Sequence, residues 1–173
     1  MLERIRRGGR VAIGPLLISA ATALGGCRPA VTRGELLYER HFHPYPIVLS
    51  PEAIAAQPEL AAAYEAYRSG RYDTVVAVTR RYTDGVARVP LVMMALAMGY
   101  MHEDSLAAAD DVLAVLEAHP DLGDDASWYR GLILVRRGEF ARARGVLATA
   151  KRHYDRALSD RVNAVIARLP PGG

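Results

Sequence analysis

His41 and His43 form the spacing in this 173-residue sequence that most directly suggests metal chemistry. In an extended strand, side chains two residues apart point to the same face, so both imidazoles could bind one ion. No cysteine stands near them, and no third ligand with suitable spacing accompanies the pair. We therefore expect two partly exposed linker histidines and no metal or other cofactor.

Three pairs of adjacent acids, Glu103-Asp104, Asp110-Asp111 and Asp124-Asp125, could also coordinate a cation. Each pair is predicted to lie in a turn or on a helix surface, where aspartate caps a helix or favours the positive end of its dipole. The sequence contains no G-x-S-x-G, H-E-x-x-H, P-loop or glycine-rich dinucleotide motif. The remaining histidines lie near predicted helix ends with no nucleophile beside them. We expect a protein that is not an enzyme.

The first 27 residues have the three parts of a secretory signal. A basic stretch ends at Arg10, an uncharged stretch covers residues 11–26, and Cys27 follows. This layout keeps the cations in the cytoplasm while the apolar stretch enters the membrane. Because Cys27 is the only cysteine, it cannot form an internal disulfide, and lipidation would account for its presence.

The sequence Leu24-Gly25-Gly26-Cys27 resembles the lipobox of bacterial lipoproteins. This resemblance implies a diacylglycerol on the Cys27 sulfur, cleavage before Cys27 and acylation of the new amino terminus. The other interpretation is an uncleaved anchor, since the 17 uncharged residues between Arg10 and Arg28 are at the lower limit for crossing a bilayer of about 30 Å. In both cases the rest of the chain is expected on the extracytoplasmic side of a bacterial membrane.

The net charge of +3 belongs mainly to this signal. Removing the four arginines and one acid that precede Cys27 from the 22 basic and 19 acidic residues leaves 18 of each. The remaining chain is formally neutral, so its charge does not indicate nucleic-acid binding.

Residues 28–51 contain four prolines and little helical periodicity, except in the short stretch 34–40. They are predicted to form a tether of extended or polyproline character. The middle of this linker, residues 40–49, is too apolar and aromatic for a purely solvated tether. We expect it to dock on the following domain or on a partner.

An internal repeat follows the linker. Arg-x-Gly-x-aromatic occurs around Gly70 and again around Gly138, which are 68 residues apart, and Glu103 occupies the corresponding turn between them. This spacing is similar to the tetratricopeptide repeat, a 34-residue antiparallel helix pair. In that register, the close-contact position of the first helix falls on Ala63, Leu96 and Gly131, and the aromatic position after the turn falls on Tyr72, Ser105 and Phe140. The small residue of the second helix falls on Val75, Ala108 and Ala143, and the next such position falls on Tyr82, Val115 and Ala150.

Helix propensity and breaker residues predict the same division of the chain. Helices are expected over 52–69, 72–84, 90–101, 105–118, 124–137 and 140–154. A seventh amphipathic helix should cap the last repeat, with its apolar stripe on Leu158, Val162, Val165, Ile166 and Leu169. The sequence therefore predicts an all-α protein, organised as an anchor (1–27), a linker (28–51), a helix-pair solenoid of about three units with its capping helix (52–169) and a short tail (170–173).

The tetratricopeptide resemblance also implies a concave face lined by the first helix of each unit. Its side chains are mainly aromatic and apolar, which suits an apolar peptide, a helix or the flank of another subunit. The other possibility is that the linker or the last helix fills this face. The residues placed there as partner-binding are Leu60, Tyr64, Tyr67, Arg68, Met93, Tyr100, Met101, Trp128, Leu132 and Arg136, with Ala97 and Val135 between them.

These features predict a protein–protein interaction scaffold anchored in the bacterial cell envelope. A structural rival is an accessory subunit of one large membrane complex that retains its anchor. A rival of the enzyme class is a peptidoglycan-associated factor, which would need surface carboxylates that the sequence does not single out.

Overall fold

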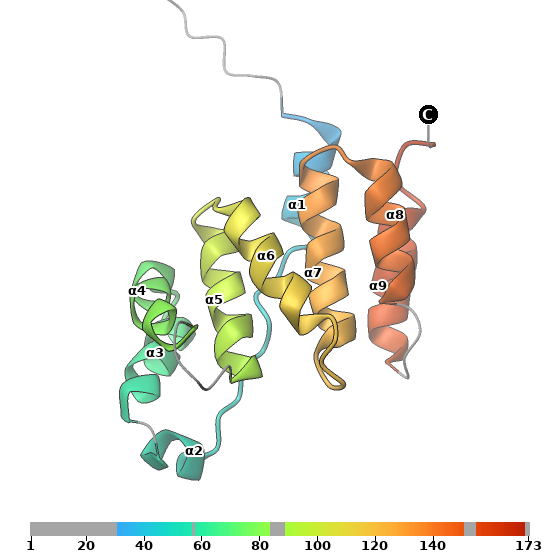
Figure 1. Cartoon of the computed structure of the whole chain (residues 1–173). Helices are drawn as coiled ribbons and strands as arrows, with labels where there is room; N and C mark the ends of the chain where they lie inside the picture. Colours follow the sequence, from blue (N-terminus) through green and yellow to red (C-terminus); the bar gives the residue numbers. More distant parts are fainter. Residues whose placement is uncertain (1–30, 57, 84–88, 151–154, 172–173) are drawn as a thin grey trace, which may run out of the picture. The chain divides into compact units, whose positions relative to one another are not determined.

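Every regular element in the described part of the chain is an α-helix, which confirms the expected all-α class. The computed structural model describes residues 31–56, 58–83, 89–150 and 155–171, and residues 31–173 form one unit by their contacts. The helices, shown in Figure 1, are α1 (Arg33–His41), α2 (Pro51–Ala56), α3 (Pro58–Arg68), α4 (Tyr72–Thr83), α5 (Pro90–His102), α6 (Leu106–Leu116), α7 (Gly123–Arg136), α8 (Phe140–Thr149) and α9 (Arg156–Ile166).

From α2 to α9, each helix packs against the next one in the chain. The most extensive contacts are between α5 and α6 and between α7 and α8, followed by α4 with α5, and then by α3 with α4 and α6 with α7. Helix α1 departs from this order because it packs on α7 and also contacts α9. A segment from the start of the described chain therefore lies against its carboxyl-terminal half.

Three turns between paired helices have the same backbone geometry at intervals of 34 residues. Gly70, Asp104 and Gly138 each have a positive φ, of 72°, 61° and 75°. The amide after each of them bonds to the carbonyl five residues earlier, at Ala66, Tyr100 and Leu134. These are the helix-ending bonds of a Schellman motif, for which glycine is the usual residue. The sequence repeat at Gly70 and Gly138 therefore reflects a repeated local structure.

The predicted register of the middle unit was wrong by one residue. Its turn residue with left-handed backbone is Asp104, whereas the repeat spacing predicts the turn at Glu103. The equivalent small or turn-following positions consequently move from Leu96, Ser105, Ala108 and Val115 to Ala97, Leu106, Ala109 and Leu116. Burial favours the corrected positions on α6, because Ala109 and Leu116 are buried whereas Val115 is 47% exposed, and Leu96 and Ala97 are both buried.

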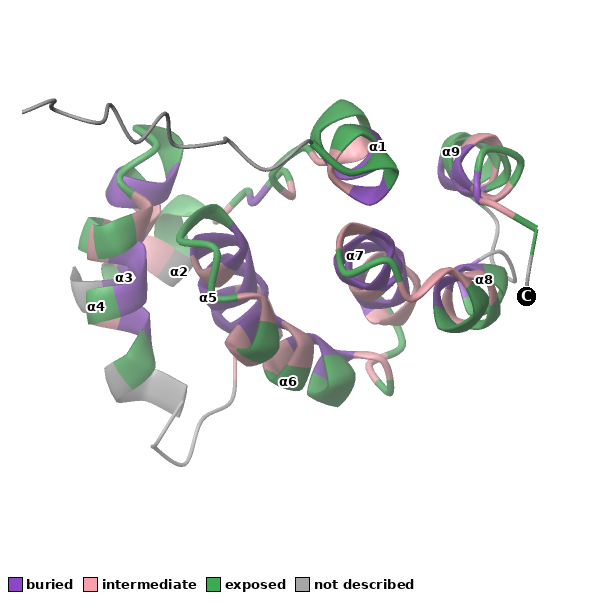
Figure 2. Ribbon diagram, turned by 90° about the horizontal axis from the view of Figure 1, so that it is seen from above, coloured by how far each residue is buried: buried purple, intermediate pink, exposed green. Residues whose placement is uncertain are grey.

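Helices α5 and α7 form the centre of the unit. Residues 92–99 of α5 and 131–135 of α7 are all buried, as Figure 2 shows by their colour. A helix that is apolar on all sides must be covered on all sides, so α5 and α7 lie between layers of other helices. Gly131 permits the close approach of α8, since a Cβ there would clash with the Leu147 side chain.

Most predicted helix bounds agree with the structure to within a few residues, but two segments differ. The predicted helix 52–69 is described as two helices, and the second, α3, begins at Pro58, where proline suits a first turn. Residues 33–41 of the predicted tether form α1. Its N-cap Thr32 forms a capping box with Glu35, which stabilises this short helix.

The predicted capping helix is present as α9. Asp155 caps it by accepting hydrogen bonds from the amides of Ala157 and Leu158. The buried stripe contains Leu158, Val162 and Val165, as expected from their spacing. The predicted lipidation site Cys27 and the rest of the signal lie outside the described residues. Within the residues that are described, no helix has both the length and the apolar character needed to cross a membrane.

Candidate peptide-binding face

Residues 33–49, here called the docked segment, contact side chains of α3 and α7 that were predicted from the sequence to form a partner surface. Helix α1 contributes the buried Leu37 and Tyr38, and Tyr38 is only 5% exposed. The Arg136 guanidinium of α7 lies 4.8 Å from the centre of the Tyr38 ring and also pairs with Asp104 at 2.7 Å. This cation–π contact joins α1 to α7 beside the middle turn.

Gly34 allows α1 to approach the backbone of α7. A Cβ at this position would fall within 3.0 Å of the Val135 carbonyl oxygen and 3.3 Å from the Arg136 carbonyl oxygen. Backbone atoms cannot rotate away as a side chain can. Glycine is therefore the residue that permits this docking distance.

An aromatic cluster holds the chain where it leaves α1. The Phe42 ring stacks on Tyr38 at 5.1 Å and meets the rings of His102 and Tyr129 edge to face at 5.4 and 6.3 Å. His102 also stacks on Tyr72 at 3.7 Å. Rings from α1, α4, α5 and α7 thus meet around Phe42, and such pairs add stabilisation beyond their buried area.

Two tyrosine hydroxyls bind the backbone of the extended part of the docked segment. Tyr129 of α7 donates to the His43 carbonyl at 2.8 Å, and Tyr67 of α3 donates to the Tyr45 carbonyl at 2.7 Å. Pro44 and Pro46 have no N–H, so an extended segment of this composition offers chiefly carbonyl oxygens. The two hydroxyls recognise the path of the backbone, and the neighbouring rings recognise apolar side chains.

Beyond Tyr45 the segment continues to α3. Ile47 is buried, and together with Leu49 it lines a narrow apolar hollow with Leu60 and Tyr64 of α3. Val48 points elsewhere, since 76% of its surface is exposed. Alternate residues of this stretch therefore face the protein, as expected for an extended chain lying on a surface.

The environment keeps these tyrosines protonated. Burial raises the pKa of Tyr38 to about 12, and burial likewise raises the pKa values of Tyr67 and Tyr129 above the ordinary value of a tyrosine. Desolvation lowers the pKa of His102, which favours the neutral ring in the stack. At neutral pH, the hydroxyls of Tyr67 and Tyr129 remain hydrogen-bond donors.

The predicted partner-binding residues differ in how accessible they are. Arg68 is exposed, with its guanidinium 5.9 Å from the centre of the Tyr64 ring, and Tyr64, Tyr100 and Arg136 are half-buried. The guanidinium of Arg161 in α9 lies 5.4 Å from the centre of the Trp128 ring. The residues that the chain itself buries are Leu60, Tyr67, Met93, Met101, Trp128 and Leu132.

Of the two possibilities left open by the sequence, the structure has the chain itself covering part of this face. The docked segment covers Tyr67 and Tyr129, and α9 covers Trp128. Sequence reasoning did not assign Tyr38, Tyr129 or Gly34 to this face. The capping-box sequence Thr32-Arg-Gly-Glu35 was a usable signal for α1, whereas nothing in the sequence indicated what Gly34 would approach.

The two histidines considered for metal binding, His41 and His43, differ in exposure. The Nε2 atom of His41 is buried without a hydrogen-bond partner, whereas His43 is exposed. In the described ranges, no group of three or more histidine, cysteine or acidic side chains is arranged to hold a metal ion. The Glu103-Asp104 pair contributes to a structural contact, because Asp104 pairs with Arg136.

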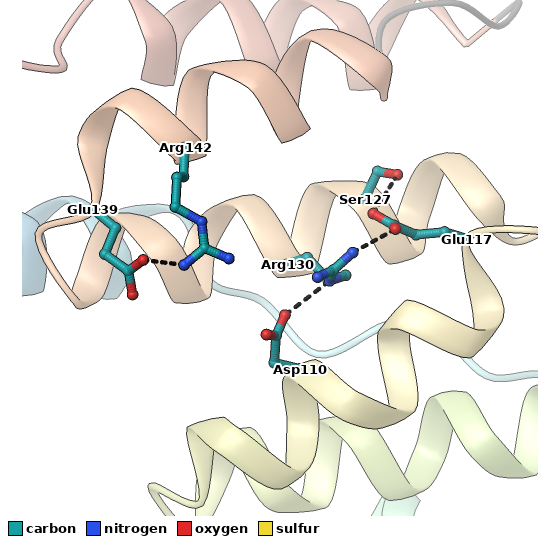
Figure 3. Close-up of polar contacts among 6 residues, drawn as sticks. All are labelled: Asp110, Glu117, Ser127, Arg130, Glu139 and Arg142. Atoms are coloured by element: carbon teal, nitrogen blue, oxygen red, sulfur yellow. Dashed lines mark hydrogen bonds and ion pairs between the residues drawn. The ribbon is translucent and has the colours of Figure 1, made fainter. Parts of the chain in front are cut away.

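A second polar cluster joins α6 to α7 (Figure 3). Arg130 donates to Asp110 at 2.8 Å and pairs with Glu117, which also accepts a hydrogen bond from Ser127 at 3.1 Å. A hollow of about 550 Å³ lies beside this cluster. Since the Arg130 charge is neutralised by two acids, the cluster is suited to holding two helices together.

Searches for a matching family model, curated protein or solved structure find none.

Proposed function

We propose that this chain is a membrane-anchored protein–protein interaction scaffold of the bacterial cell envelope, built like a tetratricopeptide-repeat solenoid, and that it has no catalytic activity. The repeat geometry supports this proposal through three turns at 34-residue intervals. The lipobox-like motif that ends at Cys27 supports the anchor and an extracytoplasmic location.

One observation carries the binding function: the face of α3, α5 and α7 already holds an extended segment in cis. Tyr67 and Tyr129 bond to backbone carbonyls, and Phe42 enters a cluster of rings. Extended proline-containing peptides are commonly recognised by this combination of aromatic grooves and hydroxyl donors. The same chemistry would accept an aromatic and proline-rich segment of another protein.

Such a partner has to compete with the docked segment. A tethered segment acts at an effective concentration in the millimolar range, so the face is closed to weak ligands. Helix α1 is held by its own contacts to α7, and residues 42–49 are held by two hydroxyl bonds and the side chains of Phe42 and Ile47. We therefore expect exchange of residues 42–49 while α1 stays docked.

The rival function is that of an accessory subunit that keeps its transmembrane anchor. Leu37 and Tyr38 belong to the same core as α7, so α1 is part of the helical unit. Mass spectrometry of the purified chain distinguishes the two. A mature chain that begins at acylated Cys27 supports the lipoprotein, and an intact Met1 without acyl groups supports the rival.

Affinity purification from detergent-solubilised membranes tests the scaffold function. The comparison uses wild type, a loosened variant carrying Phe42→Ala and Ile47→Ala, and the control Val48→Ala, which alters an exposed residue of the same stretch. A protein partner that binds the docking face should be recovered in greater amount with the loosened variant and unchanged with the control. Equal recovery with all three chains would contradict binding at this face.

A further inference from the structure

The flank of α1 that does not face α7 carries an unusual combination of side chains. Arg33, Leu36 and Arg40 recur at helical spacing on one side of the helix, and all three are exposed. Leu36 is 57% exposed, and Val31, just before the helix, is 60% exposed. Most large apolar side chains of the unit are buried, so two such residues next to arginines require an explanation.

Arg168, which follows α9, completes this surface. It lies with Arg33, Leu36, Leu37 and Arg40 around a hollow of about 450 Å³. The Arg33 Nη2 atom donates a hydrogen bond to the Arg168 carbonyl at 2.6 Å, which joins α1 to the segment after α9. The hollow has leucine side chains in its wall and three guanidinium groups around it.

These three arginines have no carboxylate partner among the described residues. The Arg168 Nη1 atom donates to the Ala164 carbonyl at 2.7 Å, and Arg40 makes no ion pair there. The nearest acids in sequence are Glu35, whose carboxylate is engaged by the Thr32 amide, and Glu39, which is exposed on the neighbouring stripe of α1. Arg130, in contrast, is paired with two acids.

We propose that this surface, formed by Val31, Arg33, Leu36, Arg40 and Arg168, binds anionic phospholipid headgroups of the membrane that holds the anchor. Guanidinium groups bind phosphate oxygens in a bidentate manner, and apolar side chains beside them enter the headgroup boundary. The inference rests on the proposed anchorage at Cys27. It adds a second contact that would orient the repeat unit on the membrane.

Chain length allows this contact. Six residue steps separate Cys27 from Arg33, which span at most about 20 Å when fully extended. Arg40 lies two helical turns further, about 10 Å along α1. An anchored chain can therefore bring these arginines to the lipid surface, where each contributes roughly fivefold to binding.

The test uses the mature acylated chain, beginning at Cys27, reconstituted into vesicles of phosphatidylcholine alone or mixed with an equal amount of phosphatidylglycerol. An environment-sensitive fluorophore is attached at Leu36→Cys or, as a control on α6, at Val115→Cys, a position of similar exposure. Acylated Cys27 offers no thiol to the label. We expect a blue-shifted emission at position 36 only with phosphatidylglycerol, and no shift at position 115.

Replacing Arg33, Arg40 and Arg168 with Gln should lower the ratio of docked to undocked chains on the order of 100-fold. A control with Gln at Arg71, Arg137 and Arg156, which are also exposed, removes the same net charge and should leave the shift unchanged. The single change Arg40→Glu serves as a second variant, with thermal melts confirming that each chain is folded.

The outcomes separate this inference from the proposed anchor. Chains that do not float with either vesicle refute the anchor. Chains that float, but whose label at position 36 stays in water with phosphatidylglycerol, refute the headgroup contact. A shift that is unaffected by the three Gln substitutions, or equally lost in the charge-matched control, also refutes it.

Discussion

Gly34→Ala is the change that tests most sharply how α1 is held on α7. The added Cβ would lie within 3.0 Å of the Val135 carbonyl oxygen, a backbone atom, so α1 as a whole has to move. Helix propensity acts in the opposite direction, because alanine in a helix is favoured over glycine by about 0.5–1 kcal/mol. Whether Gly34→Ala raises or lowers the free energy of unfolding depends on whether the gain in helix propensity or the cost of the clash is larger.

Overpacking a well-packed contact destabilises by about 1–3 kcal/mol. Subtracting the gain in helix propensity leaves a net loss of roughly 0.5–2 kcal/mol in the free energy of unfolding. In a unit of this size, such a loss lowers the melting temperature by roughly 2–8 °C. Movement of α1 would also weaken the contacts of Tyr38 with Phe42 and Arg136.

Gly145→Ala is the matched control, because Gly145 lies within α8 and a Cβ there would meet nothing within 4 Å. It should raise the free energy of unfolding by about 0.5–1 kcal/mol through helix propensity alone. Thermal melts and hydrogen exchange of the α1 amides measure both effects. If the two substitutions change the melting temperature in the same direction and leave α1 exchange unaltered, the docked position of α1 is wrong.

Three further changes test other parts of the structure. Ala143→Leu should overpack the contact between α7 and α8, where Ala143 is fully buried, and lower the free energy of unfolding by about 1–3 kcal/mol; an unchanged melting temperature would contradict the register. Arg130→Gln should lower it by about 1–2 kcal/mol, because Asp110 and Glu117 lose their partner, and denaturant titration that shows no change would exclude a stabilising role for the cluster. Since burial raises the folded-state pKa of Tyr38 to about 12, its stabilisation is complete below pH 10 and is lost as the pH rises towards 12; Tyr38→Phe should reduce this alkaline loss, and unfolding curves that match wild type would refute the assignment.

The sequence was sufficient to predict helix class and repeat spacing because glycine marks left-handed turns clearly. Gly70 and Gly138 both adopt the positive φ that glycine favours. Asp104 adopts the same backbone conformation but has no comparable signature, since aspartate is equally suited to a helix N-cap. The middle turn was therefore assigned to its neighbour, and every position in that unit moved by one residue.

What covers the aromatic face could not be predicted from the same features. Tyr67 and Met101 have the composition expected of either a partner surface or a core, because both environments favour large apolar side chains. The burial of Tyr67 follows from the path of residues 33–49, a tertiary contact set by the approach at Gly34 and the hydroxyl bonds to residues 43 and 45. Prolines around this segment also favoured an extended tether over the short helix that a capping box stabilises.

Binding of a labelled peptide with the sequence of residues 41–49, followed by fluorescence anisotropy, tests most directly whether the docking face recognises an extended segment. The full-length chain is compared as wild type, as the variant Phe42→Ala with Ile47→Ala, and as the control Val48→Ala. We predict saturable binding to the loosened variant and little binding to wild type or control, because their own segment occupies the face at a high effective concentration. Failure of the folded, loosened variant to bind the peptide, or equal binding by all three chains, would contradict the account.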